Sequence, residues 1–176
     1  MTFFLVALVL AIAIDITSKY LTYYRYIELI PEVLSIHFER NFGAAFSMLD
    51  GAVLFLIIIS SVFILGLGAF YILHTRRKKI KGQNVPKFFH IGFGLFLGGA
   101  LGNLFDRIFF GYVRDFIRLD FVNFPIFNFA DIFINIGLVM IIIYLLFFDR
   151  KSFFKSNKKE TTTDEPTTES AADSNQ

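Results

Sequence analysis

The sequence contains no cysteine, and charged residues make up only 18% of its 176 positions. Without cysteine the chain can form neither a disulfide framework nor a thiolate nucleophile, and cysteine-ligated metal sites are also excluded. Because soluble proteins average about 25% charged residues, this chain is short of the charge that a soluble surface needs. It has instead 55% hydrophobic residues, 25 phenylalanines and a mean hydropathy of +0.60. We therefore interpret it as an integral membrane protein whose phenylalanines mostly face lipid.

Several stretches lack charge over the roughly 20 residues that a helix needs to cross a bilayer. These are Gly51–Leu73, the run between Lys87 and Asp106 that only His90 interrupts, and Phe121–Phe148, whose one charge is Asp131. With an amino-terminal segment they predict four spans, at about 3–24, 52–73, 88–107 and 128–148. The predicted fold is an all-α integral membrane protein, a four-transmembrane-helix bundle, with a single membrane-embedded domain over residues 1–150.

The amino-terminal segment lacks the basic residues with which a cleavable signal peptide normally begins. The run from Thr2 to Ile14 is short for a span, and the tripeptide AIA before Ile14 could pass for a cleavage site. The helix can continue through DITSKYLTYY, where Asp15 and Lys19 are four residues apart, share a face and can pair. We expect a retained span, and a mature chain that begins near Ile14 is the alternative.

Basic residues are scarce on one side of the expected bundle, and this asymmetry orients it. The segment His74–Lys87 holds six lysines and arginines and Asp149–Lys159 holds five, whereas Asp15–Asp50 and Asp106–Asn128 hold three each. By the positive-inside rule both chain ends are cytoplasmic. Residues 151–176 should form a disordered cytoplasmic tail, because the end of this segment has no aromatic or large aliphatic residue to bury.

Two acidic residues on the expected outer side, Asp115 and Asp131, lie close to the apolar runs. An acid within lipid costs roughly 2.5–3.5 kcal/mol on insertion scales, so each is a candidate functional group. Asn128, Asp131 and Asn135 share one helix face. A purely structural role is the alternative for Asp131, because Asn128 and Asp131 have the spacing of a capping box.

The segment before the fourth span, from Gly111 to Phe127, is interpreted as a charged loop. Within it Asp120 is as good a candidate as Asp115, and the residues alone do not choose between them. Pro125 favours a turn back towards the bundle, which would bring Asp115 beside Asp131.

Small and polar residues mark two further regions. Gly94, Gly98 and Gly102 recur every four residues and predict a face on which another helix packs closely. Asp106, at the end of this helix, opposes the helix dipole and needs a cation such as Lys19 or Arg107. Apolar residues alternate around Pro31 and predict short strands on the membrane surface; they are Ile27, Leu29, Val33 and Ile36.

Five motifs together resemble the lipoprotein signal peptidase (signal peptidase II) family. They are DITSK at Asp15 to Lys19, RNFGAAFS at Arg40 to Ser47, GGALGNLFDR at Gly98 to Arg107, VRDFI at Val113 to Ile117 and FNFAD at Phe127 to Asp131, and they follow the family's order. The resemblance implies four transmembrane helices with a small extracytoplasmic β-cradle, in the bacterial cytoplasmic (inner) membrane. It implies an intramembrane aspartic endopeptidase that removes signal peptides from diacylglyceryl-modified prolipoproteins, cleaving before the lipidated cysteine.

The same resemblance assigns catalysis to Asp115 and Asp131, and so chooses Asp115 over Asp120. It implies that further residues bind substrate or brace the site: Asn41, Gly43, Asn103, Arg107, Asn128, Asp15 and Lys19. Two positions depart from the family's pattern, because Arg114 stands where an apolar residue is common and Ile132 stands where serine is common. The implied partners are lipid-modified prolipoproteins and membrane lipids, with no nucleic acid, no cofactor and no metal, and the chain is expected to be monomeric.

The chemistry needs an activated water, because no serine lies in a recognisable base-paired motif and no HExxH-type metal motif is present. Two adjacent carboxylates share one proton, so that one acts as base and the other as acid. Small residues such as Gly98, Gly102, Ala44 and Ala45 are expected to make room for substrate backbone. The alternatives are a proton- or cation-coupled carrier that uses Asp15, Asp106, Asp115 and Asp131 as relay groups, and a structural helper protein. The carrier is disfavoured because no internal repeat is evident.

Overall fold

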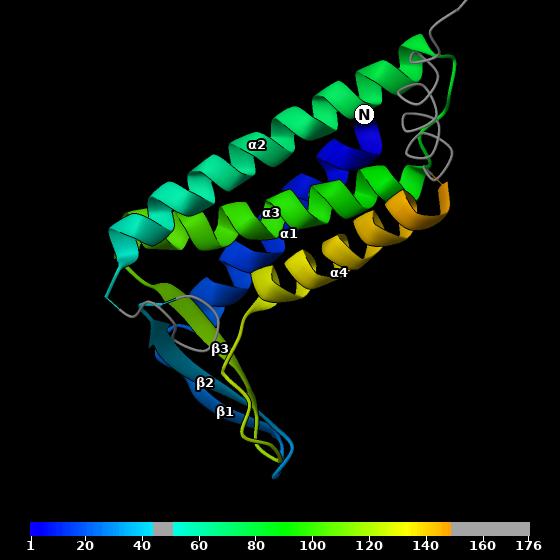
Figure 1. The fold of residues 1–176 in the computed structure, drawn as a ribbon. Helices are drawn as coiled ribbons and strands as arrows, with labels where there is room; N and C mark the ends of the chain where they lie inside the picture. The colour runs from blue at the N-terminus through cyan, green and yellow to red at the C-terminus, as the bar shows by residue number, and fades with distance from the viewer. Residues whose placement is uncertain (44–50, 149–176) are drawn as a thin grey trace, which may run out of the picture. The chain divides into compact units, whose positions relative to one another are not determined.

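The computed structural model describes residues 1–43 and 51–148, and these contain four helices long and apolar enough to cross a membrane (Figure 1). They are α1 (Thr2–Leu21), α2 (Val53–Ile80), α3 (Lys87–Phe110) and α4 (Phe129–Ile143), which continues as the π-helical segment η2 (Tyr144–Phe148). The prediction of a four-helix membrane protein is confirmed. The predicted tail, and the small residues that follow Gly43, lie outside the described residues.

Two compact units divide the chain, Met1–Ile141 and Ile142–Gln176. The described part of the second unit consists of the last two residues of α4 and the whole of η2. Every residue discussed below as part of the candidate site belongs to the first unit.

Three of the helices end at different residues from those that the apolar runs indicate, and α3, which ends at Phe110, extends three residues beyond its predicted end. α1 ends at Leu21, three residues early, and a turn follows in which Tyr24 has a φ of 56°. α2 continues to Ile80, through a segment whose last turn contains Arg77, Lys78 and Lys79. Basic residues suit the carboxyl end of a helix because they stabilise its dipole. Hydropathy therefore locates the membrane-crossing part of a helix, whereas the helix itself extends into the charged flank.

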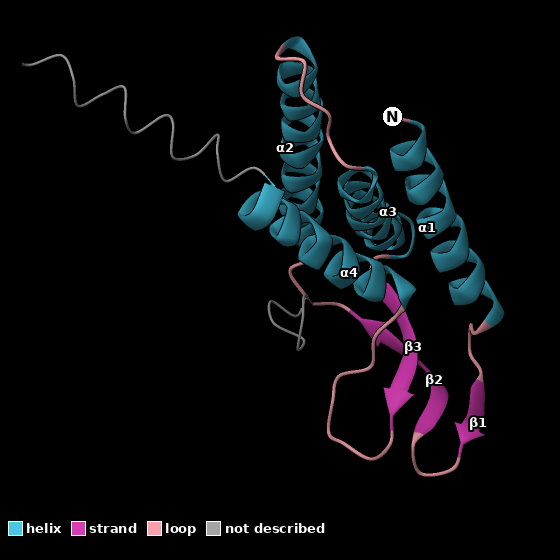
Figure 2. Ribbon diagram, turned by 90° about the vertical axis from the view of Figure 1, so that its right-hand side faces the viewer, coloured by secondary structure: helices cyan, strands magenta, loops and turns pink. Residues whose placement is uncertain are grey.

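α3 is the central helix of the bundle, surrounded by the other three (Figure 2). Half of its residues are buried, whereas α2 buries only Leu56 and Tyr71. Most of the surface of α2 is therefore not covered by the described residues of the chain. The bundle core therefore lies along α3, chiefly where α1 and α4 pack against it.

The glycines of α3 allow this close packing, as the sequence predicts. A Cβ atom at Gly98 would lie 2.7 Å from the Cβ of Ala11 on α1, so only glycine fits there without moving the helix. A Cβ atom at Gly92 would lie 2.7 Å from the Cβ of Met140 on α4. The expectation that Gly98 and Gly102 make room for substrate is wrong. Ala11 and Asp15 of α1 occupy the space beside these two glycines.

A three-stranded antiparallel sheet lies at one end of the first unit's helices, with the strand order β1-β2-β3 (Figure 1). Its strands are β1 (Tyr26–Ile30), β2 (Leu34–Asn41) and β3 (Val113–Leu119), and the ladder between β2 and β3 shifts register between Ile36 and Glu39. The strands predicted around Pro31 are present. The interpretation of Gly111–Phe127 as a loop is wrong in its first half, because β3 pairs its backbone with β2. The charges of Arg114 and Asp115 suggested solvent exposure, but both residues are buried.

Gly111 makes the connection from α3 to β3. It has a φ of 76°, and its N–H donates to the carbonyl of Arg107 at 3.1 Å, as in a left-handed helix carboxyl cap. Glycine adopts this conformation at little cost because it has no Cβ atom. The chain therefore turns sharply after α3, which places Asp115 close to the end of the helix that it has just left.

Candidate active site

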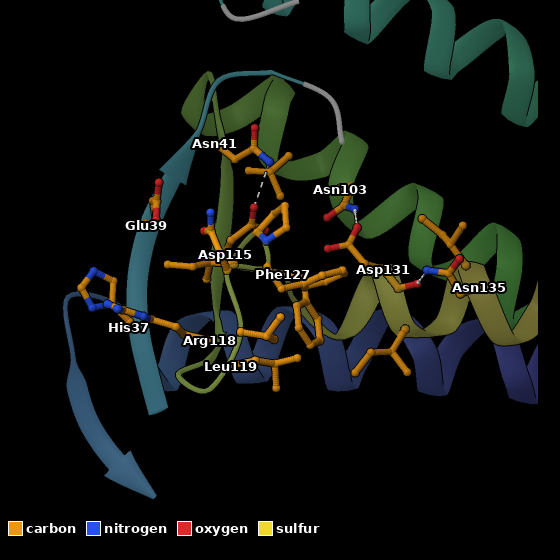
Figure 3. Close-up of a pocket in the computed structure, with 18 of the residues that line it drawn as sticks. His37, Glu39, Asn41, Asn103, Asp115, Arg118, Leu119, Phe127, Asp131 and Asn135 are labelled. Atoms are coloured by element: carbon orange, nitrogen blue, oxygen red, sulfur yellow. Dashed lines mark hydrogen bonds between the residues drawn. The ribbon is translucent and has the colours of Figure 1, made fainter. Parts of the chain in front are cut away.

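A cavity of about 1540 Å³ lies between the sheet and the start of α4, and both Asp115 and Asp131 line it (Figure 3). Asp115 comes from β3, and Asp131 comes from the first turn of α4. Asn41, Asn103 and Arg107 line the same cavity. The structure therefore brings together two acids that are sixteen residues apart in sequence, with three of the polar residues that the sequence assigns to them.

Asn128 and Asp131 form both halves of a capping box at the start of α4. The side-chain Oδ1 of Asn128 accepts the N–H of Asp131 at 3.1 Å, and Oδ2 of Asp131 accepts the N–H of Asn128 at 3.0 Å. These bonds satisfy N–H groups that the first turn of a helix leaves without partners. The structural alternative for Asp131 is therefore correct, but it is not the whole role, since the carboxylate also faces the cavity.

Asn128 joins the two carboxyl groups. Its Nδ2 donates to Oδ1 of Asp115 at 2.6 Å and to Oδ1 of Asn103 at 3.1 Å, while its backbone N–H binds Asp131. The residue is fully buried, so its amide has no competing water. A single side chain thus fixes the position of Asp115 relative to the start of α4.

Two further asparagines complete the set of donors. Nδ2 of Asn41 donates to Oδ2 of Asp115, and Nδ2 of Asn103 donates to Oδ1 of Asp131, each at 2.9 Å (Figure 3). Every carboxylate oxygen of the pair therefore accepts an amide N–H, two from asparagine side chains at Asp115 and one from a side chain at Asp131. Each oxygen keeps a second lone pair for another partner.

Burial is the main cause of the raised pKa of Asp115, whose surface is only 3% exposed. The negative charge of Asp131 adds to this effect, and together they raise the pKa of Asp115 to about 7. Hydrogen bonds from Asn41 and Asn128 and the charge of Lys19 act in the opposite direction but are outweighed. Near neutral pH, Asp115 therefore exchanges a proton readily, as a general acid must.

Gly43 and Arg107 hold Asn41 in its orientation. The N–H of Gly43 donates to Oδ1 of Asn41 at 2.9 Å, so the Nδ2 group of Asn41 is directed at Asp115. Nη2 of Arg107 donates to the carbonyl of Gly43, also at 2.9 Å. Arg107 thus lines the cavity and also supports Asn41 through the backbone of Gly43. It is not the cation that pairs with Asp106.

The cations that pair with Asp106 are Lys19 and Arg114. Nζ of Lys19 lies 3.3 Å from Oδ2 of Asp106 and 2.8 Å from Oδ2 of Asp15. Nη2 of Arg114 lies 2.7 Å from Oδ1 of Asp106, and its guanidinium stacks 4.3 Å from the ring centroid of Phe110. The expected pairs of Lys19 with Asp15 and with Asp106 are both present. No surface of Lys19, Asp15 or Asp106 is exposed. Each of these charges is therefore stabilised by the opposite charges beside it and not by water.

Two candidate residues in the cavity wall do not bind the carboxylate pair. Asp120 forms an ion pair with Arg118 at 3.1 Å, and Nδ2 of Asn135 donates to the backbone carbonyl of Asp131 at 2.9 Å. Asp120 and Asn135 both line the cavity, but their polar atoms are engaged elsewhere. The geometry thus places Asp115, and not Asp120, in the hydrogen-bonded group that contains Asp131. The residues alone could not make this choice.

Two residues of the cavity wall, His37 and Glu39, escaped the sequence-based interpretation, and so did the pairing of Arg114 with Asp106, although Arg114 itself was noted as a departure from the family's pattern. His37 and Glu39 line the cavity, and Glu39 is the partner of Asp115 in the β2–β3 ladder. Their signal was present, because β2 carries a polar residue at every second position from Ser35 to Asn41. Arg114 gave a weaker signal, since its partner Asp106 belongs to another element and only the turn at Gly111 brings the two together.

The described residues, 1–43 and 51–148, contain no group of three or more histidine or acidic side chains placed to hold a metal ion. The carboxyl groups of Asp115 and Asp131 instead receive amide N–H groups on all four oxygens.

Sequence comparison relates this chain to known peptidases. The family model described as signal peptidase (SPase) II matches residues 7–147, which include every site residue discussed above. The lipoprotein signal peptidase of Enterococcus faecalis is 37% identical over 147 residues, covering 81% of this chain and 86% of the relative. The lipoprotein signal peptidase of Microcystis aeruginosa is 36% identical over 146 residues, covering 80% and 89%.

Comparison of structures agrees. A solved structure described as a bacterial membrane enzyme, at 2.3 Å resolution, has a TM-score of 0.72 and 30% identity, covering 95% of this chain and 96% of that one. A second such structure, at 1.9 Å resolution, has a TM-score of 0.71 and 32% identity, covering 84% and 95%. The similarity thus extends over the helices and the sheet alike.

Proposed function

The chain belongs to the signal peptidase II family, and we propose that it removes signal peptides from bacterial prolipoproteins by aspartic catalysis at Asp115 and Asp131. One observation carries the proposal: both carboxyl groups line one cavity and are joined by the buried Asn128. A pair held in this way keeps a fixed separation while both groups remain open to a substrate. Asn41 and Asn103 complete the donors that orient the pair.

The proposed reaction is hydrolysis of a peptide bond by a water held between the two acids. Asp115, whose pKa is raised to about 7, carries the shared proton and polarises the scissile carbonyl. Asp131 takes a proton from the water, which then attacks the carbonyl carbon. When the carbon–nitrogen bond breaks, a proton passes from the acids to the departing amine. The products are a signal peptide with a new carboxyl group and a mature chain with a free amino group.

The substrate is a diacylglyceryl-modified prolipoprotein, and cleavage falls before its lipidated cysteine. The cavity supports this proposal because its wall is mixed. His37, Glu39 and Arg118 give it a polar side along the sheet, and Phe127, Ile132 and Ile136 give it an apolar side at the start of α4. A polar backbone and an attached acyl chain would thus each meet a compatible surface.

The distribution of basic residues supports a location in the cytoplasmic membrane with both termini inside and the site near the outer face. A helical signal sequence that crosses the same membrane would present its carboxyl end at that depth. The residues named in the site come from α1, α3, α4 and the sheet of one chain, so a monomer can supply them all.

The test uses purified protein in detergent with a diacylglyceryl-modified precursor. We expect mass spectrometry to show a released signal peptide and a mature chain that begins at the lipidated cysteine. The same precursor without lipid is the control for substrate class. Release from the lipidated precursor at another bond would contradict the proposed cleavage position, and no release would contradict the function.

Variants then test the catalytic pair. Asp115→Asn and Asp131→Asn should each reduce turnover to background, because an amide can neither accept nor supply the required proton. Glu28→Gln is the matched control, since Glu28 is exposed on β1 outside the cavity. Full activity in either aspartate variant would show that the aspartic mechanism is wrong, even if the precursor is cleaved.

A further inference from the structure

We propose that four buried charged residues, Asp15, Lys19, Asp106 and Arg114, act as positioning residues that set the separation of the two catalytic carboxyl groups. This buried network depends on the proposed function, because it positions the pair that performs the proposed reaction. None of its four members lines the cavity, so none can contact the substrate there. Two of them nevertheless bind the backbone N–H of the residue that directly precedes each catalytic carboxyl group, Ala130 before Asp131 and Arg114 before Asp115.

Asp15 holds the residue that precedes Asp131. Oδ1 of Asp15 accepts the backbone N–H of Ala130 at 3.0 Å. This N–H lies in the first turn of α4, where helices leave N–H groups without intrahelical partners. Ala130 is fully buried, so no water can take the place of the carboxylate. A residue of α1 thereby fixes the end of α4 from which Asp131 projects.

Asp106 holds the residue that precedes Asp115 in the same manner. Oδ2 of Asp106 accepts the backbone N–H of Arg114 at 3.0 Å. The Arg114 side chain binds the same carboxylate, with Nη2 at 2.7 Å and Nε at 3.2 Å from Oδ1. The carboxylate thus receives both the backbone and the guanidinium of one residue. The last turns of α3 thereby fix the start of β3, from which Asp115 projects.

Lys19 connects these two anchoring carboxylates. Its Nζ lies 2.8 Å from Oδ2 of Asp15 and 3.3 Å from Oδ2 of Asp106. It also donates to Oδ1 of Asn103 at 2.9 Å, and Asn103 in turn donates to Asp131. The ammonium group thus donates hydrogen bonds to Asp15 and Asn103 and forms an ion pair with Asp106. One buried cation therefore joins the anchor of Asp131, the anchor of Asp115 and an asparagine that binds Asp131 directly.

The network contains two acids and two bases, so it is balanced in charge, and its burial makes each member depend on the others. Without the network, Asp115 and Asp131 could still transfer protons, but the distance between their carboxyl groups would no longer be fixed. Misplacement of reacting groups by about 1 Å can cost on the order of 100-fold in rate. The network should therefore affect kcat and leave KM nearly unchanged, because substrate contacts lie on the cavity side.

The experiment compares a single variant with a charge-balanced pair. Lys19→Met leaves two buried carboxylates with one cation, and its Tm should fall. Lys19→Met combined with Asp15→Asn keeps Asp106 and Arg114 as a balanced pair, and the new amide oxygen can still accept the N–H of Ala130. The variant therefore removes only the ammonium group that joins the two anchors to each other and to Asn103. We expect the pair to regain most of the lost Tm, while kcat on the lipidated precursor stays about 100-fold low and KM stays within about twofold.

A second balanced pair, Asp106→Asn with Arg114→Met, retains Asp15 and Lys19 and gives an independent reading if the first pair folds poorly. Lys87→Met is the control for loss of a lysine, because Lys87 begins α3, about 24 Å along the helix from Asn103. Recovery of kcat together with Tm in the balanced pairs would overturn the proposal and leave the network a stability element. Normal kcat with a raised KM would overturn it too. Failure of the unaltered protein to cleave the precursor would instead refute the proposed function.

Discussion

At the scale of single residues, Asp115 is subject to opposing effects, and burial with the charge of Asp131 outweighs the two asparagine hydrogen bonds. The proposed acid is active only while it is protonated. Activity should therefore decline as the pH rises through about 7, the pKa of Asp115. Initial rates on a lipidated precursor between pH 5 and pH 9 provide the measurement. A rate that stays constant up to pH 9 would show that Asp115 is not the acid.

The same residue predicts how stability depends on pH. The pKa of Asp115 is raised from 3.8 to about 7 on folding, so the folded chain holds this proton more tightly than the unfolded chain. The stabilisation is complete below pH 3.8 and is lost as the pH rises through about 7. The Tm of the unaltered protein in detergent should therefore fall from pH 5 to pH 8. Asp115→Asn, which cannot titrate, should show a smaller fall, and an equal fall would assign the effect to other groups.

Asn128 has two separable roles, as the cap of α4 and as the amide that bridges to Asp115. Serine caps helices about as well as asparagine, whereas alanine costs about 1 kcal/mol at such a position. Asn128→Ser should therefore keep more stability than Asn128→Ala, yet both should lose most activity because neither has an amide N–H for Asp115. Denaturation midpoints and turnover measured on both variants test this. Activity retained by the serine variant would show that the bridge is dispensable.

At the scale of secondary-structure elements, α3 and α1 approach through glycine. A Cβ atom at Gly98 would lie 2.7 Å from the Cβ of Ala11, which is too close. Gly98→Ala should therefore destabilise the protein by about 1–3 kcal/mol, the usual cost of overpacking. Gly66→Ala on α2 is the matched control, because nothing lies within 4 Å of its new Cβ atom. Alanine should be neutral or stabilising there, since it favours helix over glycine by up to about 1 kcal/mol. Equal effects at the two positions would contradict the packing argument.

The helices could be predicted because membrane-crossing segments require long charge-free runs. The capping box at Asn128 could also be predicted, because it depends only on the local spacing of two residues. β3 could not, because its Arg114 and Asp115 are buried only through partners from other elements. Pro125 indicated a turn that brings Asp115 beside Asp131. The choice of Asp115 over Asp120 rested on resemblance, as did the involvement of Asn41 and Asn103. The network around Lys19 was only partly accessible, since its i, i+4 pair with Asp15 is local whereas Arg114 depends on the turn at Gly111.

At the scale of the whole molecule, the absence of cysteine permits a direct test of topology. The distribution of basic residues predicts that the sheet lies outside and that the α2–α3 connection lies inside. Glu28 on β1 and Asn84 between α2 and α3 are both exposed. A membrane-impermeant maleimide should label Glu28→Cys in intact cells, or in spheroplasts where an outer membrane blocks access, and should label Asn84→Cys only after permeabilisation. The reverse pattern would invert the proposed orientation.

The bond from Asp15 to Ala130 joins positions 115 residues apart in the chain. During synthesis α1 is made first, and its most distant partner is among the last parts of the first unit to leave the ribosome. Until then Asp15 and Lys19 have each other, at 2.8 Å within one helix. This local pair lowers the cost of placing two charges in the membrane before α3 and α4 exist. It follows that an interrupted chain without α4 has no assembled cavity, and that the peptidase becomes competent only once its last helix is in place.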